Sequence, residues 1–268
     1  VHLGRSGLKV SRLCLGTMTF GREADEEASF AMMDRFIDLG GTFVDTADAY
    51  SLGGSEEIVG RWMKERRCRD RIVLATKVYS PMGPGPNDGG LSRLHIQQAV
   101  EASLRRLQTD VIDLYQIHRW DFATPAEETL EALNDLVRQG KVRYIGCSNL
   151  AAWQLSKYLH LSHMAHWSRF ISVQPIYNAI NRSIESEVLP LCEEQGLGVI
   201  SYNPLAGGML TGKYRRGQEL PVNARLKELE VYYQRYHTEQ ALDIVEAFVA
   251  AAQERGVTPA QLALAWVL

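Results

Sequence analysis

The feature that most constrains the fold is the alternation of short apolar, β-rich runs with amphipathic stretches along the whole chain. Seven runs predict strands, at Leu13–Gly16, Phe43–Thr46, Ile72–Thr76, Val111–Gln116, Val142–Gly146, Ile171–Val173 and Gly198–Tyr202. The run from Ile72 to Ala75 is apolar without strict alternation, which is typical of strands that are covered on both faces. Such alternation predicts a parallel sheet with right-handed helical crossovers.

Residues that start and stop helices lie between these runs. Thr124 and Thr258 each precede a proline, and Glu127 and Gln261 follow at the capping-box position, so both threonines are predicted to cap helices. Glycines that fit left-handed helix ends are Gly40, Gly140, Gly196 and Gly256. After the first three of these glycines a predicted strand follows within a few residues, which agrees with the alternation.

The pattern favours a closed barrel over an open doubly wound sheet. No Gly-x-Gly-x-x-Gly follows a predicted strand, and no Pro/Ser-rich linker divides the chain. The sequence therefore predicts an α/β fold, a (β/α)8 TIM barrel forming a single domain over residues 1–268. The segment His2–Arg12 is predicted to be an N-terminal β-hairpin that turns at Arg5-Ser6-Gly7 and closes the barrel floor.

The number of predicted strands leads to one further expectation. Only seven core strands are found, and the sequence stops within a predicted helix that contains Trp266. Because a parallel barrel lacking one strand would expose two sheet edges, we expect the eighth strand and helix to be missing from this sequence.

Composition excludes several classes of function. A net charge of -3 gives no field that would attract nucleic acid or an anionic membrane, and no apolar run approaches the ~20 residues of a membrane helix. The N-terminus lacks a secretory signal, and the four cysteines are far apart, so we expect a cytoplasmic protein. His160, His163 and His166 have no acidic partner nearby and are interpreted as an exposed helix end, so no metal site is predicted.

Polar side chains stand at the carboxyl ends of consecutive predicted strands, where barrel enzymes carry their chemistry. The second strand ends near Asp45 and is followed by Tyr50, the third ends at Lys77, and the fourth ends at His118. A free tyrosine, with a pKa of about 10, is a poor acid near neutral pH, but a nearby ammonium favours the phenolate. A carboxylate would keep that lysine charged, and a neutral histidine could hold a carbonyl oxygen. This set suits carbonyl reduction.

Several motifs carry a resemblance to a known family. They are Gly41 to Ser51, Gly54 to Gly60, Ala75 to Lys77, Asp113 to His118, Gly140 to Asn149 and Gln174 to Asn178. With them the chain, from about Leu3 to Leu268, resembles the aldo-keto reductases, most of all the branch of bacterial stress-type reductases and potassium-channel β subunits.

The resemblance implies a catalytic tetrad of Asp45, Tyr50, Lys77 and His118, with Tyr50 as general acid/base. It implies NADP(H) as cofactor, with NAD(H) as the alternative. Ser148, Asn149 and Gln174 would hydrogen-bond the carboxamide, and Tyr202 would stack on the nicotinamide. Backbone amides around Gly207, together with Lys213 and Arg225, would bind the pyrophosphate. The other expected cofactor contacts are Thr17, Met18, Asp45, Asn203 and Leu205.

We therefore expect an NADP-dependent oxidoreductase that reversibly reduces aldehydes or ketones to alcohols. Tyr79, Arg119 and Trp120 follow tetrad positions in the sequence. With Tyr50 and His118, they are predicted to line the substrate-binding site. One alternative enzyme is a Schiff-base aldolase using the barrel-end lysine. A non-enzymatic alternative is a redox-sensing regulatory subunit resembling the potassium-channel β subunits. Those proteins typically carry Asn at the tetrad histidine position, where this chain has His118.

Overall fold

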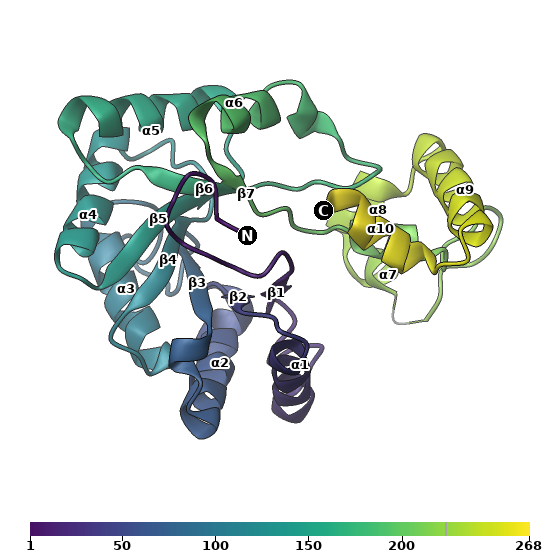
Figure 1. Ribbon diagram of the computed structural model, residues 1–268, viewed down its shortest axis with the longest axis horizontal. Coiled ribbons are helices and arrows are strands. Elements are labelled where there is room, and N and C mark those ends of the chain that lie inside the picture. Colours follow the sequence, from purple (N-terminus) through teal and green to yellow (C-terminus); the bar gives the residue numbers. More distant parts are fainter. Residues whose placement is uncertain (223) are drawn as a thin grey trace. The chain divides into compact units, whose positions relative to one another are not determined.

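The computed structural model describes residues 1–222 and 224–268, and its contacts divide them into two compact units (Figure 1). The first unit comprises Val1–Gln174 and Leu191–Ile200, and the second comprises Pro175–Pro190 and Ser201–Leu268. A single domain over residues 1–268 stays a prediction.

The first unit is built on a parallel sheet. Its strands are β1 (Cys14–Gly16), β2 (Phe43–Asp45), β3 (Val73–Val78), β4 (Ile112–Ile117), β5 (Val142–Ser148), β6 (Phe170–Gln174) and β7 (Gly198–Val199). Among the described residues these seven strands form one sheet in the order β1 to β7, and every neighbouring pair is parallel. The alternation therefore predicted the strands and their directions, although β7 is shorter than the predicted Gly198–Tyr202.

Helices cover the outside of this sheet (Figure 1). They are α1 (Glu26–Asp38), α2 (Gly54–Arg66), α3 (Arg93–Leu107), α4 (Ala126–Arg138) and α5 (Ala152–Ala165), with short 3-10 helices η1 (Tyr50–Gly53) and η2 (Arg69–Arg71). In α3 the apolar stripe of Ile96, Val100, Leu104 and Leu107 is buried. The Ser92 hydroxyl caps this helix by accepting a hydrogen bond from the His95 amide at 3.2 Å.

One of the two predicted threonine caps is confirmed, and the other is wrong. Thr258 accepts a hydrogen bond from the Gln261 amide at 3.2 Å, and the Gln261 side chain accepts one from the Thr258 amide at 2.9 Å. Thr124 does not cap α4, whose N-cap is Pro125 without a side-chain bond. Because α4 begins at Ala126, Thr124 lies one residue before the N-cap, and its hydroxyl donates to Asp121 Oδ2 at 2.7 Å.

The sheet of the first unit is curled. Gln174 Nε2 on β6 donates to Asp45 Oδ1 on β2 at 3.1 Å, although four strand spacings separate β2 and β6 in the sheet order. In a flat sheet those strands would lie roughly 19 Å apart. The inner faces of the strands therefore turn toward one another, and with sequential parallel strands this is an α/β fold of the (β/α)8 type.

The N-terminal hairpin is confirmed. His2 and Lys9 form an antiparallel bridge, and the Leu3 amide donates to the Leu8 carbonyl at 2.9 Å. The buried side chains of this hairpin join a core cluster with residues from the strands of the same unit. That cluster consists of Leu3, Val10, Phe43, Ala75, Leu114 and Ile200. Because Phe43 begins β2, the hairpin covers the amino ends of the strands.

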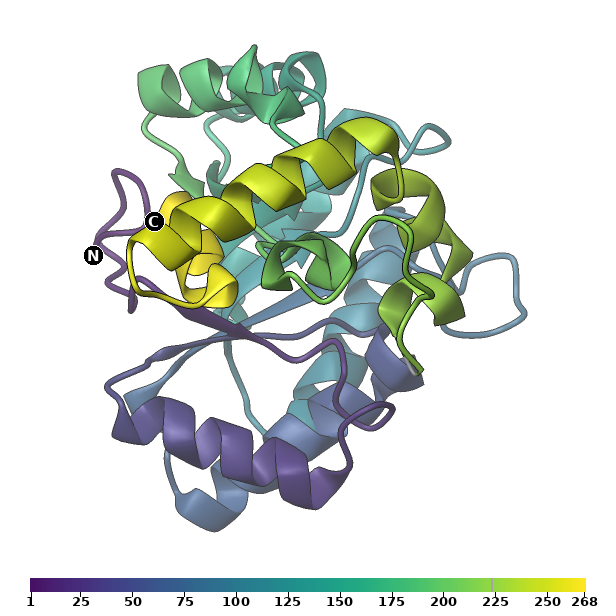
Figure 2. The ribbon, with the colours of Figure 1, turned by 90° about the vertical axis from the view of Figure 1, so that its right-hand side faces the viewer.

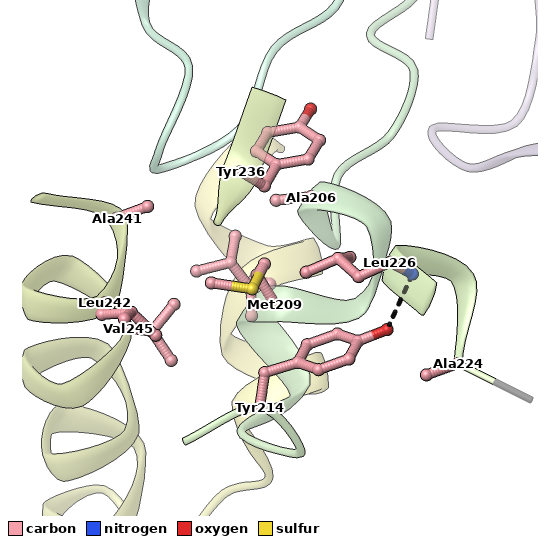
Figure 3. Packing of buried hydrophobic residues seen from close by; sticks show 11 residues of the cluster. Ala206, Met209, Tyr214, Ala224, Leu226, Tyr236, Ala241, Leu242 and Val245 are labelled. Atoms are coloured by element: carbon pink, nitrogen blue, oxygen red, sulfur yellow. Dashed lines mark hydrogen bonds between the residues drawn. The ribbon is translucent and has the colours of Figure 1, made fainter. Parts of the chain in front are cut away.

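The second unit is helical and has its own core. Its helices are η3 (Ser183–Glu185), η4 (Ala206–Thr211), α7 (Arg225–Glu228), α8 (Glu230–Tyr236), α9 (Glu239–Glu254) and α10 (Pro259–Val267), and α6 (Val188–Gln195) contains the point where the chain passes between units. Helices α9 and α10 contact η4 (Figure 2). Met209, Tyr214, Leu226 and Tyr236 are buried there (Figure 3). No helix of the described chain combines the length and apolarity that crossing a bilayer requires.

Candidate active site

The loop after β2 places Tyr50 beside the end of β3. The Thr46 amide donates to the Ala75 carbonyl at 2.9 Å, and the Asp48 amide donates to the Lys77 carbonyl at 3.2 Å. These bonds continue the pairing of β2 with β3 beyond Asp45. The chain then enters η1 at Tyr50, so the phenol lies next to the Lys77 side chain.

Lys77 is fully buried, and its ammonium group has three acceptors. Nζ donates to Asp45 Oδ2 at 2.5 Å, to the Thr46 carbonyl at 2.8 Å and to the Tyr50 hydroxyl at 3.2 Å. Burial alone would lower the pKa of Lys77, but the Asp45 carboxylate and the Tyr50 oxygen raise it above its ordinary value. Lys77 is therefore a permanently charged donor that contacts the phenol oxygen.

Asp45 receives hydrogen bonds from three other strands. Oδ2 accepts from Lys77 on β3, and Oδ1 accepts from Gln116 Nε2 on β4 at 2.9 Å and from Gln174 Nε2 on β6 at 3.1 Å. Gln116, which is fully buried, is a site residue that was not predicted from the sequence. The available signal was its spacing, because Gln116 lies two residues before His118 and alternate residues of a strand share one face.

His118 follows β4 and lies next to Tyr50. The two ring centroids are 5.9 Å apart with the planes at 77°. Burial, followed by the charges of Lys77 and Arg119, lowers the pKa of His118 to about 3. The imidazole is therefore neutral near pH 7. Its Nδ1 atom is buried and has no hydrogen-bond partner among the described residues.

Side chains with amide and hydroxyl groups collect at the ends of β5 and β6. The Ser148 hydroxyl donates to the Gln174 carbonyl at 2.7 Å, and Asn149 Nδ2 donates to Ser148 Oγ at 2.9 Å. Asn149 Nδ2 also contacts the His118 carbonyl at 3.1 Å. The structure thus brings these three predicted cofactor residues together beside the predicted tetrad, within the first unit.

On the outer face of β3, a second polar group supports the strand that carries Lys77. Thr76 points away from Lys77, and its hydroxyl donates to Glu56 Oε1 at 2.6 Å. Glu56 is fully buried and pairs with Arg106 Nε at 2.7 Å. Glu56 on α2 therefore binds both β3, through a hydrogen bond, and α3, through an ion pair. Strand β3 is the strand whose inner face carries Lys77.

The predicted substrate residues lie after β3 and β4. The Arg119 guanidinium carbon stands 5.5 Å from the centre of the half-buried Tyr79 ring. The half-buried Trp120 packs against Trp153 and Tyr158, with ring centroids 5.4 and 5.0 Å away. Tyr79, Arg119 and Trp120 therefore lie on the segments that follow the candidate catalytic strands.

Two predicted cofactor residues near β1 differ in accessibility. Thr17 is fully buried, and its hydroxyl is engaged with the Asp45 carbonyl at 3.1 Å and Ser55 Oγ at 2.8 Å. Met18 is partly exposed. Thr17 therefore supports the backbone of Asp45, whereas Met18 remains open to contact.

The other predicted cofactor residues belong to the second unit. Tyr202, Asn203, Leu205 and Arg225 are partly exposed, Gly207 is buried and Lys213 is exposed. Three successive residues, Ala206, Gly207 and Gly208, have positive φ angles of 51°, 67° and 94°. The turn between Asn203 and Lys213 is therefore an unusual backbone structure rather than a regular helix.

Within residues 1–222 and 224–268, no set of three or more His, Cys, Asp or Glu side chains is arranged to hold a metal. His160, His163 and His166 lie instead along a groove of about 640 Å³, together with Trp167 and Arg169.

Comparison with known proteins identifies the family. A model described as the aldo/keto reductase family matches residues 12–268. The chain belongs to the aldo/keto reductase family. The contact of Asp45, Lys77 and Tyr50 is thus found in an aldo/keto reductase, and the protein is an oxidoreductase.

Similar proteins carry a range of descriptions. This aldo/keto reductase is 42% identical to the uncharacterized oxidoreductase YrpG of Bacillus subtilis (strain 168), over 100% of this chain and 82% of that protein. It is 38% identical to the versiconal hemiacetal acetate reductase of Aspergillus parasiticus, over 100% and 84%. It is also 39% identical to a probable voltage-gated potassium channel subunit beta of Oryza sativa subsp. japonica, over 99% and 82%.

Proposed function

We propose that this protein is an NADP(H)-dependent reductase of small aldehydes and ketones that also oxidises the corresponding alcohols. The observation that carries the proposal is the contact of Lys77 Nζ with both Asp45 Oδ2, at 2.5 Å, and the Tyr50 hydroxyl, at 3.2 Å. Reduction of a carbonyl requires a hydride at carbon and a proton at oxygen. A bound reduced nicotinamide supplies the hydride, and Tyr50 supplies the proton.

The charges around Tyr50 support its role as general acid. When the Tyr50 hydroxyl gives its proton to the carbonyl oxygen, negative charge develops on the phenol oxygen. The ammonium of Lys77 contacts that oxygen and stabilises the charge, and Asp45 keeps the ammonium protonated inside the buried site. In alcohol oxidation the same phenol oxygen accepts the proton.

His118 suits a role in orienting the substrate. Its neutral imidazole can donate one hydrogen bond without bringing a second positive charge beside Lys77. Because the His118 ring lies edge-on to the Tyr50 ring, a carbonyl oxygen can be held by both side chains. Tyr79, Arg119 and Trp120 are proposed to contact the rest of the substrate.

The residues of each unit fit a nicotinamide dinucleotide. In the first unit, Ser148, Asn149 and Gln174 lie together and carry the hydroxyl and amide groups that can bind a carboxamide. In the second unit, Tyr202 is proposed to stack on the nicotinamide, and Lys213 and Arg225 to hold the diphosphate. Asn203, Leu205 and Met18 are proposed as further contacts, and Thr17 as a support. NADP(H) is proposed over NAD(H) on family resemblance.

A Schiff-base aldolase would need a neutral lysine nucleophile. Lys77 is paired with Asp45, which raises the pKa of Lys77 against the lowering effect of burial. The observed pairing therefore favours a proton-transfer role for Lys77 over a nucleophilic one.

The proposed location is cytoplasmic. Free thiols at Cys14, Cys68, Cys147 and Cys192 support this proposal.

The proposal is tested by following NADPH oxidation with a panel of small aldehydes. The wild-type protein should turn over, and Tyr50→Phe should lower kcat by about 100-fold or more, the usual size of a general-acid contribution. NADPH binding, measured by tryptophan quenching, should persist in Tyr50→Phe because the variant keeps the ring.

Tyr144→Phe provides the matched control, since Tyr144 packs with the cluster at the amino ends of the strands. This control should retain wild-type turnover. Full activity in Tyr50→Phe, or no NADPH oxidation with any aldehyde of the panel, would refute the proposed function.

A cofactor-binding regulatory subunit is a second candidate, because the rice relative is a probable potassium channel subunit beta. Such a protein would bind NADPH and turn over very slowly. Micromolar binding of NADPH together with negligible turnover of every aldehyde would favour this second candidate.

A further inference from the structure

A buried polar network in the second unit centres on the hydroxyl of Tyr236, at the end of α8. Tyr236 and Asn178 are both fully buried. The Tyr236 hydroxyl accepts hydrogen bonds from Asn203 Nδ2 at 2.8 Å and from Asn178 Nδ2 at 3.2 Å. Asn178 Nδ2 also contacts the Asn203 carbonyl at 3.0 Å. The network thus joins three segments of the second unit that are far apart in sequence.

Asn203 links this network to the turn that contains Gly207 and Gly208. Its Oδ1 atom accepts a hydrogen bond from the Gly207 amide at 2.8 Å. Because a carboxamide is planar, fixing its nitrogen against Tyr236 also fixes the direction of its oxygen. The Tyr236 hydroxyl therefore determines where the Gly207 amide is held.

The turn needs such support because its backbone is strained. Ala206 has a φ angle of 51°, which is unusual for a residue with a side chain other than Asn or Asp. The turn is also packed tightly against α8, since a Cβ atom on Gly207 would lie 2.7 Å from Cδ1 of Tyr232. Figure 3 shows the Tyr236 ring beside Ala206.

We propose that Tyr236 is a positioning residue that, through Asn203, holds the Gly207 turn in the conformation that receives the cofactor diphosphate. Its role in cofactor binding rests on the proposed function, whereas its role in holding the turn does not. Its ring belongs to the core of the second unit, but the positioning is done by its hydroxyl, which Tyr236→Phe removes without changing the ring.

The first test measures cofactor affinity and turnover. Tyr236→Phe should raise the Kd and the KM for NADPH by about fivefold to tenfold, the effect expected for losing the buried hydrogen bond from Asn203 that orients its carboxamide. At saturating NADPH, kcat should change by less than about twofold, because the candidate proton-transfer residues are untouched. Tyr233→Phe removes a hydroxyl from an exposed ring of the same helix and should leave all three values unchanged.

A double-mutant cycle separates positioning from a general loss of stability. If Tyr236 acts through Asn203, the variant Tyr236→Phe/Asn203→Ala should bind NADPH no more weakly than Asn203→Ala alone. A merely structural tyrosine would give additive losses of stability, and it would leave the Kd unchanged well below the unfolding temperature.

Amide hydrogen exchange provides a test without cofactor. The Gly207 amide should exchange about fivefold faster or more in free Tyr236→Phe than in the free wild type. If the wild type binds NADPH, unchanged Gly207 exchange or an unchanged Kd in Tyr236→Phe would overturn the inference. A wild type that binds neither NADPH nor NADH would refute the proposed function instead, and the exchange rate of Gly207 would still decide whether Tyr236 positions the turn.

Discussion

At the scale of single residues, the candidate site shows which positions a sequence reveals. Asp45, Lys77 and His118 are charged or titratable groups at the ends of apolar strands, so their placement could be predicted from the sequence. For Gln116 the spacing from His118 indicates only a shared strand face, because a neutral amide inside a buried strand resembles any polar residue paired with the backbone. Its contact with Asp45 depends on the curling of the sheet, which no local pattern encodes.

Replacing Gln116 tests the support of Asp45. In Gln116→Leu, Asp45 Oδ1 keeps Gln174 as a donor but loses the bond from Gln116 at 2.9 Å. We expect kcat/KM for aldehyde reduction to fall about fivefold to tenfold, because Asp45 holds Lys77 less rigidly. Gln97→Leu, at an exposed position of α3, is the control and should have no effect. An unchanged kcat/KM in Gln116→Leu would show that Gln174 alone suffices.

The low pKa of His118 predicts a pH dependence of stability. In the folded protein the pKa of His118 is about 3, whereas an unfolded histidine titrates near 6.5. Between these values the unfolded chain binds a proton that the folded protein does not, so stability falls as pH decreases below 6.5. The expected slope from this group is at most about 1.4 kcal/mol per pH unit.

Urea unfolding of the wild type and His118→Asn between pH 7 and pH 4.5 measures this effect. The variant should lose less stability over this range, and the difference should begin only below pH 6.5. His160→Asn, at an exposed position, should follow the wild type. Parallel curves for the wild type and His118→Asn would mean that His118 becomes protonated in the folded protein.

At the scale of elements, the sequence pattern predicted the strands of the sheet and the apolar stripe of α3, because both depend on local periodicity. It failed at the start of α4. Thr124 satisfies the rule for a helix cap, yet the helix begins one residue later than that rule predicts, at Ala126, and the Thr124 hydroxyl binds Asp121. The Asn203–Tyr236 contact could not be predicted either, because it joins residues 33 positions apart.

Gly60 tests the packing of α2 against α3. Alanine usually favours a helix interior over glycine by about 1 kcal/mol. Here a Cβ atom at position 60 would lie 2.3 Å from the backbone oxygen of Arg106, so the two helices must separate. We expect Gly60→Ala to lower the free energy of unfolding by about 1–3 kcal/mol.

Thermal or urea unfolding measures this change, and Gly54→Ala is the control within the same helix. A Cβ atom there would meet only the Ser51 side chain, at 3.3 Å. A stabilised Gly60→Ala variant would show that helix propensity outweighs the close contact.

At the scale of the whole molecule, binding and stability are linked. The sheet and the predicted tetrad lie in the first unit, and the glycine turn with Lys213 lies in the second. A ligand that binds the folded chain alone stabilises it by about 2.7 kcal/mol at a concentration of 100 Kd. For a chain of this size we expect NADPH to raise the midpoint of thermal unfolding by about 5–10 °C.

A thermal-shift titration with NADPH and NADH checks this expectation. The dinucleotide with the lower Kd should give the larger rise at equal concentration, and adenosine should give little. A midpoint that stays constant with both dinucleotides would contradict cofactor binding by this chain.

The curled sheet has a consequence for how activity is lost during unfolding. Asp45 holds donors from β3, β4 and β6 at once, so its surroundings depend on the distance across the sheet as well as on neighbouring strands. A slight opening of the sheet would separate Gln174 from Asp45 while every helix stayed intact. Turnover is therefore a more sensitive measure of sheet curvature than circular dichroism, and inactivation can precede any change in helix content.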